Sequence, residues 1–245
     1  MRIEVVGCGD AFGSGGRFNT CLHVAQGEEA LLVDCGASSL VALNRTAIDR
    51  NKVAAILFTH FHGDHFAGLP FFLLDAQFNT RRRAALTIAG PRGVEMRART
   101  VCEALFPGAF DAQRVFETRF VEIAPDAPAT LAGFAIAAFP MVHDERVGPC
   151  LGYRIARAGK VVAFSGDSGW CDSLPALVAG ADVALIECYQ RDRTLPNHLD
   201  WSVLAARLPR ATIGRLILTH MARSMLAGEA PQGAERAFDG MVIEL

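Results

Sequence analysis

Short apolar runs bounded by glycine-bearing turns dominate the first third of the chain, and this pattern predicts β-strands. Residues 54–58, Ala-Ala-Ile-Leu-Phe, are the clearest case, because a short and uninterrupted apolar run is typical of a buried strand. Further along, predicted strands alternate with helical patterns. The predicted strands are residues 2–7, 20–25, 29–34, 54–58, 86–89, 115–123, 129–138, 150–157, 160–165, 182–187 and 215–219, and the predicted helices are residues 37–45, 66–78, 92–105, 173–179 and 200–207.

The elements follow one another without a linker or a low-complexity stretch, so we expect one α/β (α+β) domain over residues 1–245. Hydrophobic residues make up 51% of the chain and charged residues 20%, which predicts a substantial core and argues against wholesale disorder. The net charge of −2 argues against a broad nucleic-acid-binding face.

Cellular location is predicted from two further features. The N-terminal apolar run contains Glu4 and is short, unlike a secretory signal, and no stretch approaches the roughly 18 apolar residues of a membrane helix. The 7 cysteines are scattered and include no Cys-x-x-Cys pair, so we expect buried thiols rather than disulfides. Together these features predict a cytoplasmic protein with no membrane segment.

Candidate chemistry is concentrated directly after the strand at residues 54–58. The segment Thr-His-Phe-His-Gly-Asp-His, residues 59–65, contains three of the chain's 7 histidines. Loops at strand ends are where rigid scaffolds display catalytic groups. Imidazole nitrogens with a carboxylate suit zinc, and also manganese or iron. The segment therefore predicts a metal site built from His60, His62, Asp64 and His65.

Three more candidate ligands each follow a predicted strand. They are His143, Asp167 and His220. Residues 56–60 and 217–220 also resemble each other, because both are apolar strands that end in Thr-His. We expect such strands to bring their histidines to a shared edge of a two-sheet sandwich. A two-metal hydrolase site with a bridging group needs about six to eight ligands, which the combined set supplies.

The order His-x-His-x-Asp-His, later His, later Asp, later His resembles the metallo-β-lactamase superfamily over essentially the whole chain. This resemblance implies a four-layer αββα sandwich with a dinuclear site on one edge of its two sheets. It also implies a role for each ligand. One metal would be held by His60, His62 and His143, the second by Asp64, His65 and His220, and Asp167 would bridge the two.

A finer resemblance is to the ribonuclease Z-like branch of that superfamily. Its glycine-rich first loop is similar to residues 7–17, and other similar segments are residues 33–36, 90–93, 151–155 and 181–187. The resemblance implies that His198 helps to protonate the leaving group and that Glu187 orients this histidine. A carboxylate on one imidazole nitrogen sets the tautomer and the ring angle.

The chain also departs from ribonuclease Z. Residues 94–142, where an arm that grips transfer RNA would be expected, predict one helix and two strands without a long basic, glycine-rich insertion. His198 is followed by Leu199-Asp200-Trp201 rather than small hydroxyl residues, and Ile186 replaces a histidine before the glutamate. We therefore expect a small-molecule or short nucleotide-like ester as substrate rather than transfer RNA.

The predicted chemistry is metal-dependent hydrolysis, most simply of a phosphodiester, with two Zn²⁺ per chain or manganese or iron in their place. In this hypothesis a metal-bridging hydroxide attacks the ester, Asp64 is both a ligand and the group that orients the water or accepts its proton, and His198 acts as general acid. Alternatives are a lactonase- or arylsulfatase-type ester hydrolase, a mononuclear-iron persulfide dioxygenase, and a metal-stabilised binding module. Glyoxalase II is disfavoured, because only 25 residues (245 − 220) follow His220. By analogy with ribonuclease Z-like proteins, a homodimer is an open expectation.

Other polar and aromatic features have plainer interpretations. The glycine loop at residues 7–16 lacks phosphate-loop and dinucleotide spacing and is expected to form a tight turn under the metal site. Arg81, Arg82 and Arg83 are expected to be a solvated helix end, with substrate steering as the alternative. His23 is expected to be structural, and residues 71–74 are expected to belong to the core.

Overall fold

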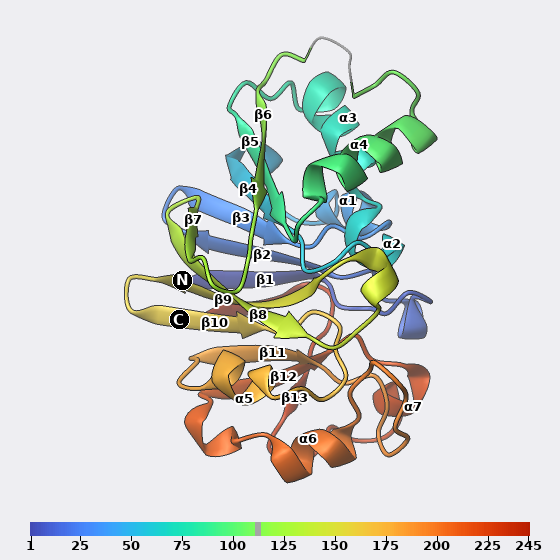
Figure 1. Cartoon of the computed structure of the whole chain (residues 1–245), viewed down its shortest axis with the longest axis vertical. Helices are drawn as coiled ribbons and strands as arrows, with labels where there is room; N and C mark the ends of the chain where they lie inside the picture. Colours follow the sequence, from blue (N-terminus) through green and yellow to red (C-terminus); the bar gives the residue numbers. More distant parts are fainter. Residues whose placement is uncertain (111–113) are drawn as a thin grey trace.

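The computed structural model describes residues 1–110 and 114–245, and these residues build two mixed β-sheets that face each other (Figure 1). Each sheet has seven strands in the described part of the chain. The first sheet has the order β14 (Met241–Glu244), β1 (Arg2–Gly7), β2 (Cys21–Gln26), β3 (Glu29–Val33), β4 (Val53–Leu57), β5 (Leu86–Gly90) and β6 (Thr118–Glu122). The second has the order β13 (Glu235–Arg236), β12 (Arg215–Thr219), β11 (Val183–Glu187), β10 (Lys160–Phe164), β9 (Cys150–Arg157), β8 (Phe134–Met141) and β7 (Ala129–Leu131).

Helices cover the outer face of each sheet, which gives the αββα layering that the sequence predicts. The helices on the first sheet are α1 (Ser39–Leu43), α2 (Gly63–Phe66), α3 (Leu69–Leu74) and α4 (Val94–Leu105), and those on the second are α5 (Ser173–Val178), α6 (Trp201–Arg207) and α7 (Arg223–Leu226). Within the described residues, no helix combines the length and the apolar character that crossing a membrane would require.

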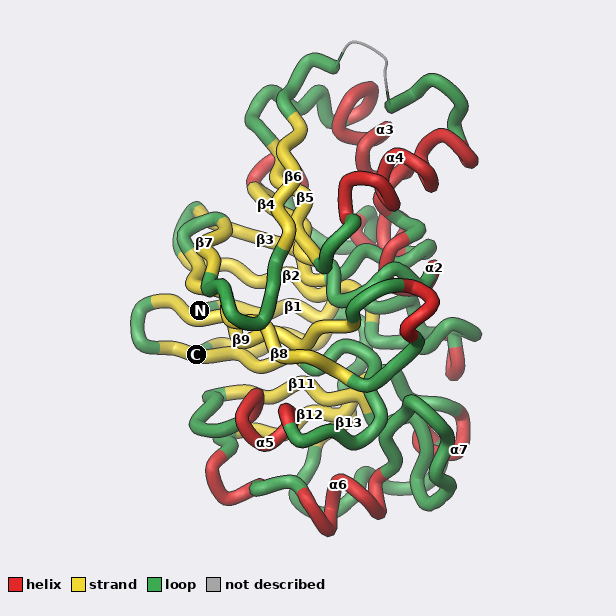
Figure 2. The backbone as a smooth tube through the Cα atoms, viewed as in Figure 1, coloured by secondary structure: helices red, strands yellow, loops and turns green. Residues whose placement is uncertain are grey.

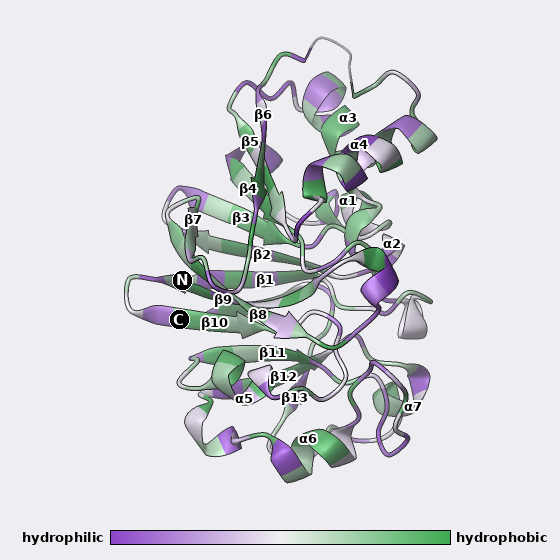
Figure 3. Ribbon diagram, viewed as in Figure 1, coloured by the Kyte–Doolittle hydropathy of each residue, from purple (hydrophilic) through white to green (hydrophobic). Residues whose placement is uncertain are grey.

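Alternating residues of the central strands belong to different cores. Ala55 and Leu57 of β4 pack between the two sheets, whereas Ile56 and Phe58, directly after β4, pack under the helices of the first sheet. A strand buried on both faces carries apolar residues at consecutive positions. This explains why the predicted strand at residues 54–58 was so evident, and Figure 3 shows the apolar character along the central strands.

Two predicted elements differ from those observed. The helix expected at residues 66–78 begins earlier and is split into α2, α3 and a π-helical turn at Asp75–Asn79. The interruption falls at Gly68, whose backbone N–H donates to the Cys35 carbonyl oxygen outside the helix over 2.9 Å, and Pro70 in the first turn of α3 has no N–H to donate. The strand expected at residues 129–138 is a hairpin of β7 and β8, turned at Ala132 and Gly133, which have φ values of 48° and 73°.

Short elements near the C-terminus were not predicted, namely α7, β13 and β14.

The arginine run at residues 81–83 was expected to be a solvated helix end, and this expectation was wrong at Arg82, which is buried. Its guanidinium donates to the carbonyl oxygens of Val53 at 2.7 Å and Ala85 at 2.8 Å, and so fastens the start of β4 to the segment before β5. Arg81 and Arg83 are exposed as expected.

Parallel pairing brings the ends of several strands to one edge of the sandwich. β3, β4, β5 and β6 run parallel in the first sheet, and β10, β11, β12 and β13 run parallel in the second. The loops that leave β4, β10 and β12 lie on the side of the sheets opposite to the chain termini, whereas the loop after β6 runs back toward β7 (Figure 2). The termini themselves lie together, since the Met1 amino group donates to the Leu245 carbonyl oxygen.

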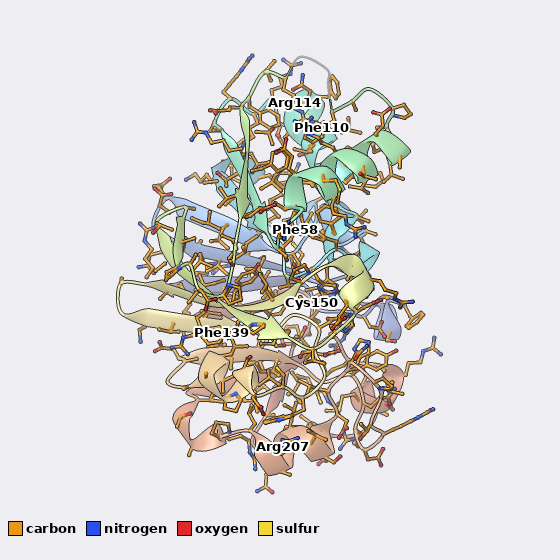
Figure 4. All side chains as sticks on the ribbon, in the orientation of Figure 1. Phe58, Phe110, Arg114, Phe139, Cys150 and Arg207 are labelled. Carbon is orange, nitrogen blue, oxygen red and sulfur yellow. The ribbon has the colours of Figure 1, made fainter. Side chains whose placement is uncertain are left out.

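Two hydrogen bonds join the sheets beside this edge. The buried Tyr153 hydroxyl of β9 donates to the carbonyl oxygen of Phe58 over 2.7 Å, and the backbone N–H of Leu151 donates to the carbonyl oxygen of Thr59 over 3.0 Å. Phe58, labelled in Figure 4, ends the β4 run that leads into the histidine loop. The position of that loop is therefore set by contacts with the second sheet as well as the first.

Candidate metal centre

Three imidazoles converge where the loop after β4 meets the loop after β8. His62 Nδ1 lies 3.1 Å from His60 Nε2 and 3.1 Å from His143 Nε2. His60 is fully buried and His143 is nearly so, whereas the side chain of His62 is 32% exposed. Three ring nitrogens that face one another at this distance form a ready set of lone pairs for one cation.

A second group lies beside the first and also draws on both sheets. Asp64 Oδ2 is 3.1 Å from His220 Nε2 and 3.5 Å from His65 Nε2. Asp167 completes the group, with Oδ1 3.1 Å from His65 Nε2 and Oδ2 3.3 Å from His220 Nε2. One donor atom from each of these four residues lies within 4.8 Å of the others.

Asp167 is placed between the two groups. Its Oδ2 atom lies 3.7 Å from His143 Nε2 and 4.0 Å from His60 Nε2, so the same oxygen approaches both groups. The backbone that carries it is tightly packed, because a Cβ atom on Gly166 would lie 2.9 Å from Thr59 Cβ. This close approach holds the Asp167 loop of the second sheet against the histidine loop of the first.

The donor atoms fit divalent cations. Within the described residues, His65 Nε2 and Asp167 Oδ1 are buried and face each other at 3.1 Å, and neither makes a well-formed hydrogen bond. Buried polar atoms in this state are unfavourable, and a bound cation would satisfy both. Burial also lowers the pKa of His60 well below its ordinary value, which keeps this imidazole neutral and its lone pair available. The predicted ligands thus come together in two adjacent groups, and Asp167, a member of the second, also lies 3.7 Å from His143 of the first.

Outer contacts fix the rings of the buried histidines. Asp34 accepts from His65 Nδ1 at 2.7 Å and also from the backbone N–H of Thr59 at 2.8 Å. The Nδ1 atom of His143 lies 2.9 Å from the carbonyl oxygen of Asn197 and donates to it in the tautomer that leaves Nε2 free. Such contacts orient a ring and leave its other nitrogen facing the metal position.

Glu187 connects His198 to His220 of the second ligand group. The carboxylate is fully buried at the end of β11, its Oε1 atom accepts from His198 Nδ1, and the same oxygen lies 3.6 Å from His220 Nδ1. The backbone N–H of Ser168 donates to Oε2 over 2.6 Å. Burial opposes protonation of His198, but the hydrogen bond and charge of Glu187 raise its pKa above the ordinary value. The His198–Glu187 pair that the sequence resemblance implies is therefore formed.

Comparison with known proteins agrees with this architecture. The model of the beta-lactamase superfamily domain matches residues 29–221, which is most of the chain. The chain belongs to the metallo-β-lactamase superfamily.

Individual relatives span almost the whole length of this superfamily member. Ribonuclease Z of Mycobacterium bovis is 28% identical over 254 aligned residues, which cover 95% of this chain and 90% of that protein. The probable metallo-hydrolase YhfI of Bacillus subtilis is 26% identical over 250 aligned residues, covering 99% and 96%. The crystal structure of the short form of human tRNase Z aligns with a TM-score of 0.76 and 25% identity, and the alignment covers 100% of this chain and 99% of that one.

The open face of the metallo-β-lactamase site is a cavity of about 260 Å³. Members of both ligand groups and His198 line it. The rest of the lining comes from the glycine-rich loop at residues 7–17, from Gly63 of the histidine loop and from Tyr189, which follows β11. The lining residues are Ala11, Phe12, His62, Gly63, Asp64, His143, Asp167, Tyr189, His198 and His220. Arg81, Arg82 and Arg83 do not line it.

Asp144 is a site residue that no sequence pattern singles out. Its Oδ2 atom lies 3.4 Å from His62 Nε2, the outer nitrogen of the most exposed ring in the first group. Arg146 holds this carboxylate through two contacts of 2.8 and 2.7 Å. An acidic residue in an exposed loop carries no distinguishing pattern, so only the fold reveals that it faces His62. Tyr189 was missed for the same reason.

The cysteines agree with the sequence expectation. All 7 are free, and every one except Cys171 is buried. Burial raises the pKa of the Cys35 thiol to about 12 and that of Cys102 to about 11.

Proposed function

We propose that this protein is a hydrolase that uses two divalent metal ions, most simply zinc, to cleave a phosphodiester. The observation that carries the proposal is the position of Asp167, whose Oδ2 atom lies 3.3 Å from His220 Nε2 in one ligand group and 3.7 Å from His143 Nε2 in the other. Two ligand groups that share one carboxylate support two metals rather than one.

In this proposal each ligand group holds one ion. His60, His62 and His143 would hold the first, Asp64, His65 and His220 would hold the second, and Asp167 would be available to both. When bound, the ions supply an acidified water and neutralise charge on the phosphoryl oxygens. A phosphodiester suits this arrangement, because two cations stabilise both the entering and the leaving oxygen.

Two side chains manage protons. Burial opposes ionisation of Asp64, but His65 and His220 hold its pKa well below the usual range, so Asp64 is an ionised carboxylate that can accept a hydrogen bond from the attacking water and orient it. His198, protonated and fixed through Nδ1 by Glu187, donates a proton from Nε2 to the departing oxygen. The bond between phosphorus and the leaving oxygen breaks as the bond from water to phosphorus forms.

We further propose a compact substrate rather than transfer RNA. Across the described residues 94–110 and 114–142, the chain forms α4, β6, β7 and β8, and a long basic, glycine-rich arm is not among these elements. The relatives named ribonuclease Z support phosphodiester chemistry in general. The assembly of the site from both sheets supports one domain over residues 1–245, and the free buried thiols support a cytoplasmic location.

Hydrolysis of bis(p-nitrophenyl) phosphate by zinc- or manganese-loaded protein tests this proposal. We expect turnover that disappears on chelation and returns when metal is added. Parallel assays with p-nitrophenyl acetate and p-nitrophenyl sulfate test the ester-hydrolase alternatives, and oxygen uptake with a persulfide tests the iron dioxygenase alternative. Turnover of one of these substrates without turnover of the diester would overturn the proposal.

A further inference from the structure

Two aromatic residues other than the histidines, Phe12 and Tyr189, line the cavity beside the metal centre, and we call this pair the aromatic wall. We propose that the aromatic wall stacks against a flat aromatic group on the leaving-group side of the substrate. This inference rests on the proposed phosphodiester hydrolysis and narrows it to a substrate class, namely phosphodiesters of low charge that carry an aryl group or a nucleobase next to the scissile bond.

Phe12 is displayed to solvent by an anchored loop. Its side chain is 81% exposed, although it lines the cavity. The carboxylate of Asp10, which is fully buried, accepts from the backbone N–H groups of Phe12 at 3.2 Å and of Ser14 at 2.8 Å, and from the Ser14 hydroxyl at 2.8 Å. Because the buried carboxylate fixes the backbone of this loop, only the Phe12 side chain would lose freedom when it stacks on a ligand.

Tyr189 places the aromatic wall next to the proposed general acid. Its ring centroid lies 4.9 Å from that of His198, with the two planes at 32°, and 6.0 Å from that of His220. Its backbone is fixed on both sides, because its N–H donates to the Leu199 carbonyl oxygen and its own carbonyl oxygen accepts from Ala222. Since His198 protonates the departing oxygen in the proposed reaction, a group that contacts Tyr189 lies on the leaving-group side.

Phe12 and Tyr189 come from different parts of the chain, the glycine-rich first loop and the segment after β11, and both line the same cavity. A ligand in this cavity can therefore meet an aromatic ring from either segment.

The charge of the cavity restricts the substrate further. Its lining in the described chain includes no lysine or arginine, and its cations would be the metals and the imidazoles. A polyanion would leave most of its phosphates without a basic partner, whereas a diester with one phosphate would not. The volume of about 260 Å³ suits one phosphate with one ring system.

A matched pair of ligands tests the inference by isothermal titration calorimetry on metal-loaded protein. Benzyl methyl phosphate and cyclohexylmethyl methyl phosphate carry the same charge and similar alkyl leaving groups, and differ in whether the ring is flat and aromatic. Base–aromatic stacking favours binding by roughly 5- to 150-fold, so we expect the benzyl ester to bind about tenfold more tightly. The methyl ester of uridine 5′-monophosphate distinguishes the two sources of the ring, because tighter binding than the benzyl ester assigns a nucleobase and weaker binding assigns a simple arene.

Variants assign the preference to the aromatic wall. In Phe12→Leu and Tyr189→Leu, we expect the preference for the benzyl ester to fall to less than about twofold, while Tyr189→Phe retains it. Phe78→Leu is the matched control, because Phe78 is also an exposed phenylalanine, at 70%, but it lines a separate cavity between α3 and α4. Phe78→Leu should leave the preference unchanged.

Equal binding of the two esters by the wild-type protein, or a preference that survives both leucine variants, would overturn the inference. Its failure is separable from failure of the proposed function. Loss of the aromatic preference with intact metal-dependent hydrolysis of bis(p-nitrophenyl) phosphate contradicts only the aromatic wall, whereas absence of that hydrolysis contradicts the proposed function whatever the ligands bind.

Discussion

The two sheets supply the site in different ways. The first sheet delivers His60, His62, Asp64 and His65 from one loop after β4, whereas the second sheet delivers its residues singly, from loops spread between His143 and His220. Neither ligand group is complete within one sheet, because each combines residues of the β4 loop with residues of the second sheet. We therefore expect metal binding to depend on the packing of the two sheets and to stabilise that packing in turn.

Asp167→Asn removes the second-sheet carboxylate that lies near both ligand groups, and so has the largest expected effect. The amide keeps the shape of the side chain but loses the charge that approaches both ligand groups. We expect hydrolysis of bis(p-nitrophenyl) phosphate to fall by more than about 10,000-fold, because both metal positions lose a ligand. Metal content by elemental analysis should fall as well.

The control for this change is Asp126→Asn, an equivalent substitution at an exposed position between β6 and β7. It should retain full metal content and full activity. Wild-type metal content in Asp167→Asn would show that the second sheet does not contribute this carboxylate to a metal.

His198→Ala separates proton donation from metal binding within the second sheet. His198 contacts Glu187 and lines the cavity, but it is not in either of the two proposed ligand groups. We expect kcat to fall by about 100- to 10,000-fold, the usual contribution of a general acid, with metal content unchanged. The loss should be smaller for diesters with acidic leaving groups such as p-nitrophenol, because those groups depart without a proton. An equal loss for all leaving groups would argue against the acid role.

Asp144→Asn tests whether the carboxylate of Asp144, in the loop after β8 of the second sheet, strengthens metal binding by His62 of the first ligand group. Removing the charge beside His62 Nε2 should weaken metal binding by about 10- to 100-fold, as for other carboxylates behind histidine ligands. Competition with a fluorescent chelator measures this affinity without reference to activity. Asp172→Asn, which changes another loop aspartate that does not line the cavity, is the control, and an affinity equal to that of the control would remove Asp144 from the site.

The smallest expected effect is on stability at alkaline pH, where the two outer cores should behave alike because each contains a buried thiol. Cys102, a residue of α4, packs in the core on the outer face of the first sheet, and Cys150, a residue of β9, packs in the core on the outer face of the second. Burial raises the pKa of both thiols from 9.0 to about 11. Because the folded state holds these protons more tightly than the unfolded state, their stabilisation is complete below about pH 9 and is lost as the pH rises toward 11.

The corresponding measurement is urea unfolding between pH 8 and 11 for the wild type and for Cys102→Ala. The wild-type free energy of unfolding should fall with pH, and the slope in the variant should be shallower by up to about 1.4 kcal/mol per pH unit. Identical slopes would show that Cys102 keeps an ordinary pKa in the folded protein.

The contrast between the single β4 loop and the dispersed residues of the second sheet explains which site residues could be predicted from the sequence. The β4 loop was evident because its candidate ligands are close together in the chain, and His143, Asp167 and His220 followed from their positions at strand ends. The αββα layering is confirmed by the three hydrophobic cores. The assignment of metals to these residues remains a prediction.

Features that depend on contacts between distant segments were not predicted. At the interruption of the helix after the histidine loop, Gly68 donates its backbone N–H to the distant Cys35, a contact that local periodicity does not encode. The burial of Arg82 depends on carbonyl groups of two separate segments, and Asp144 acquires its position only when the β8 loop meets His62. Polar residues of this kind look like ordinary loop residues until the fold brings their partners to them.

The most direct test of the account is the number of metal ions per chain, measured by elemental analysis of the purified wild-type protein after loading with zinc and removal of the excess. Two ligand groups that share Asp167 predict two equivalents per chain, and loss of both in Asp167→Asn. One equivalent per chain under saturating metal would contradict the dinuclear site and, with it, the proposed hydrolysis.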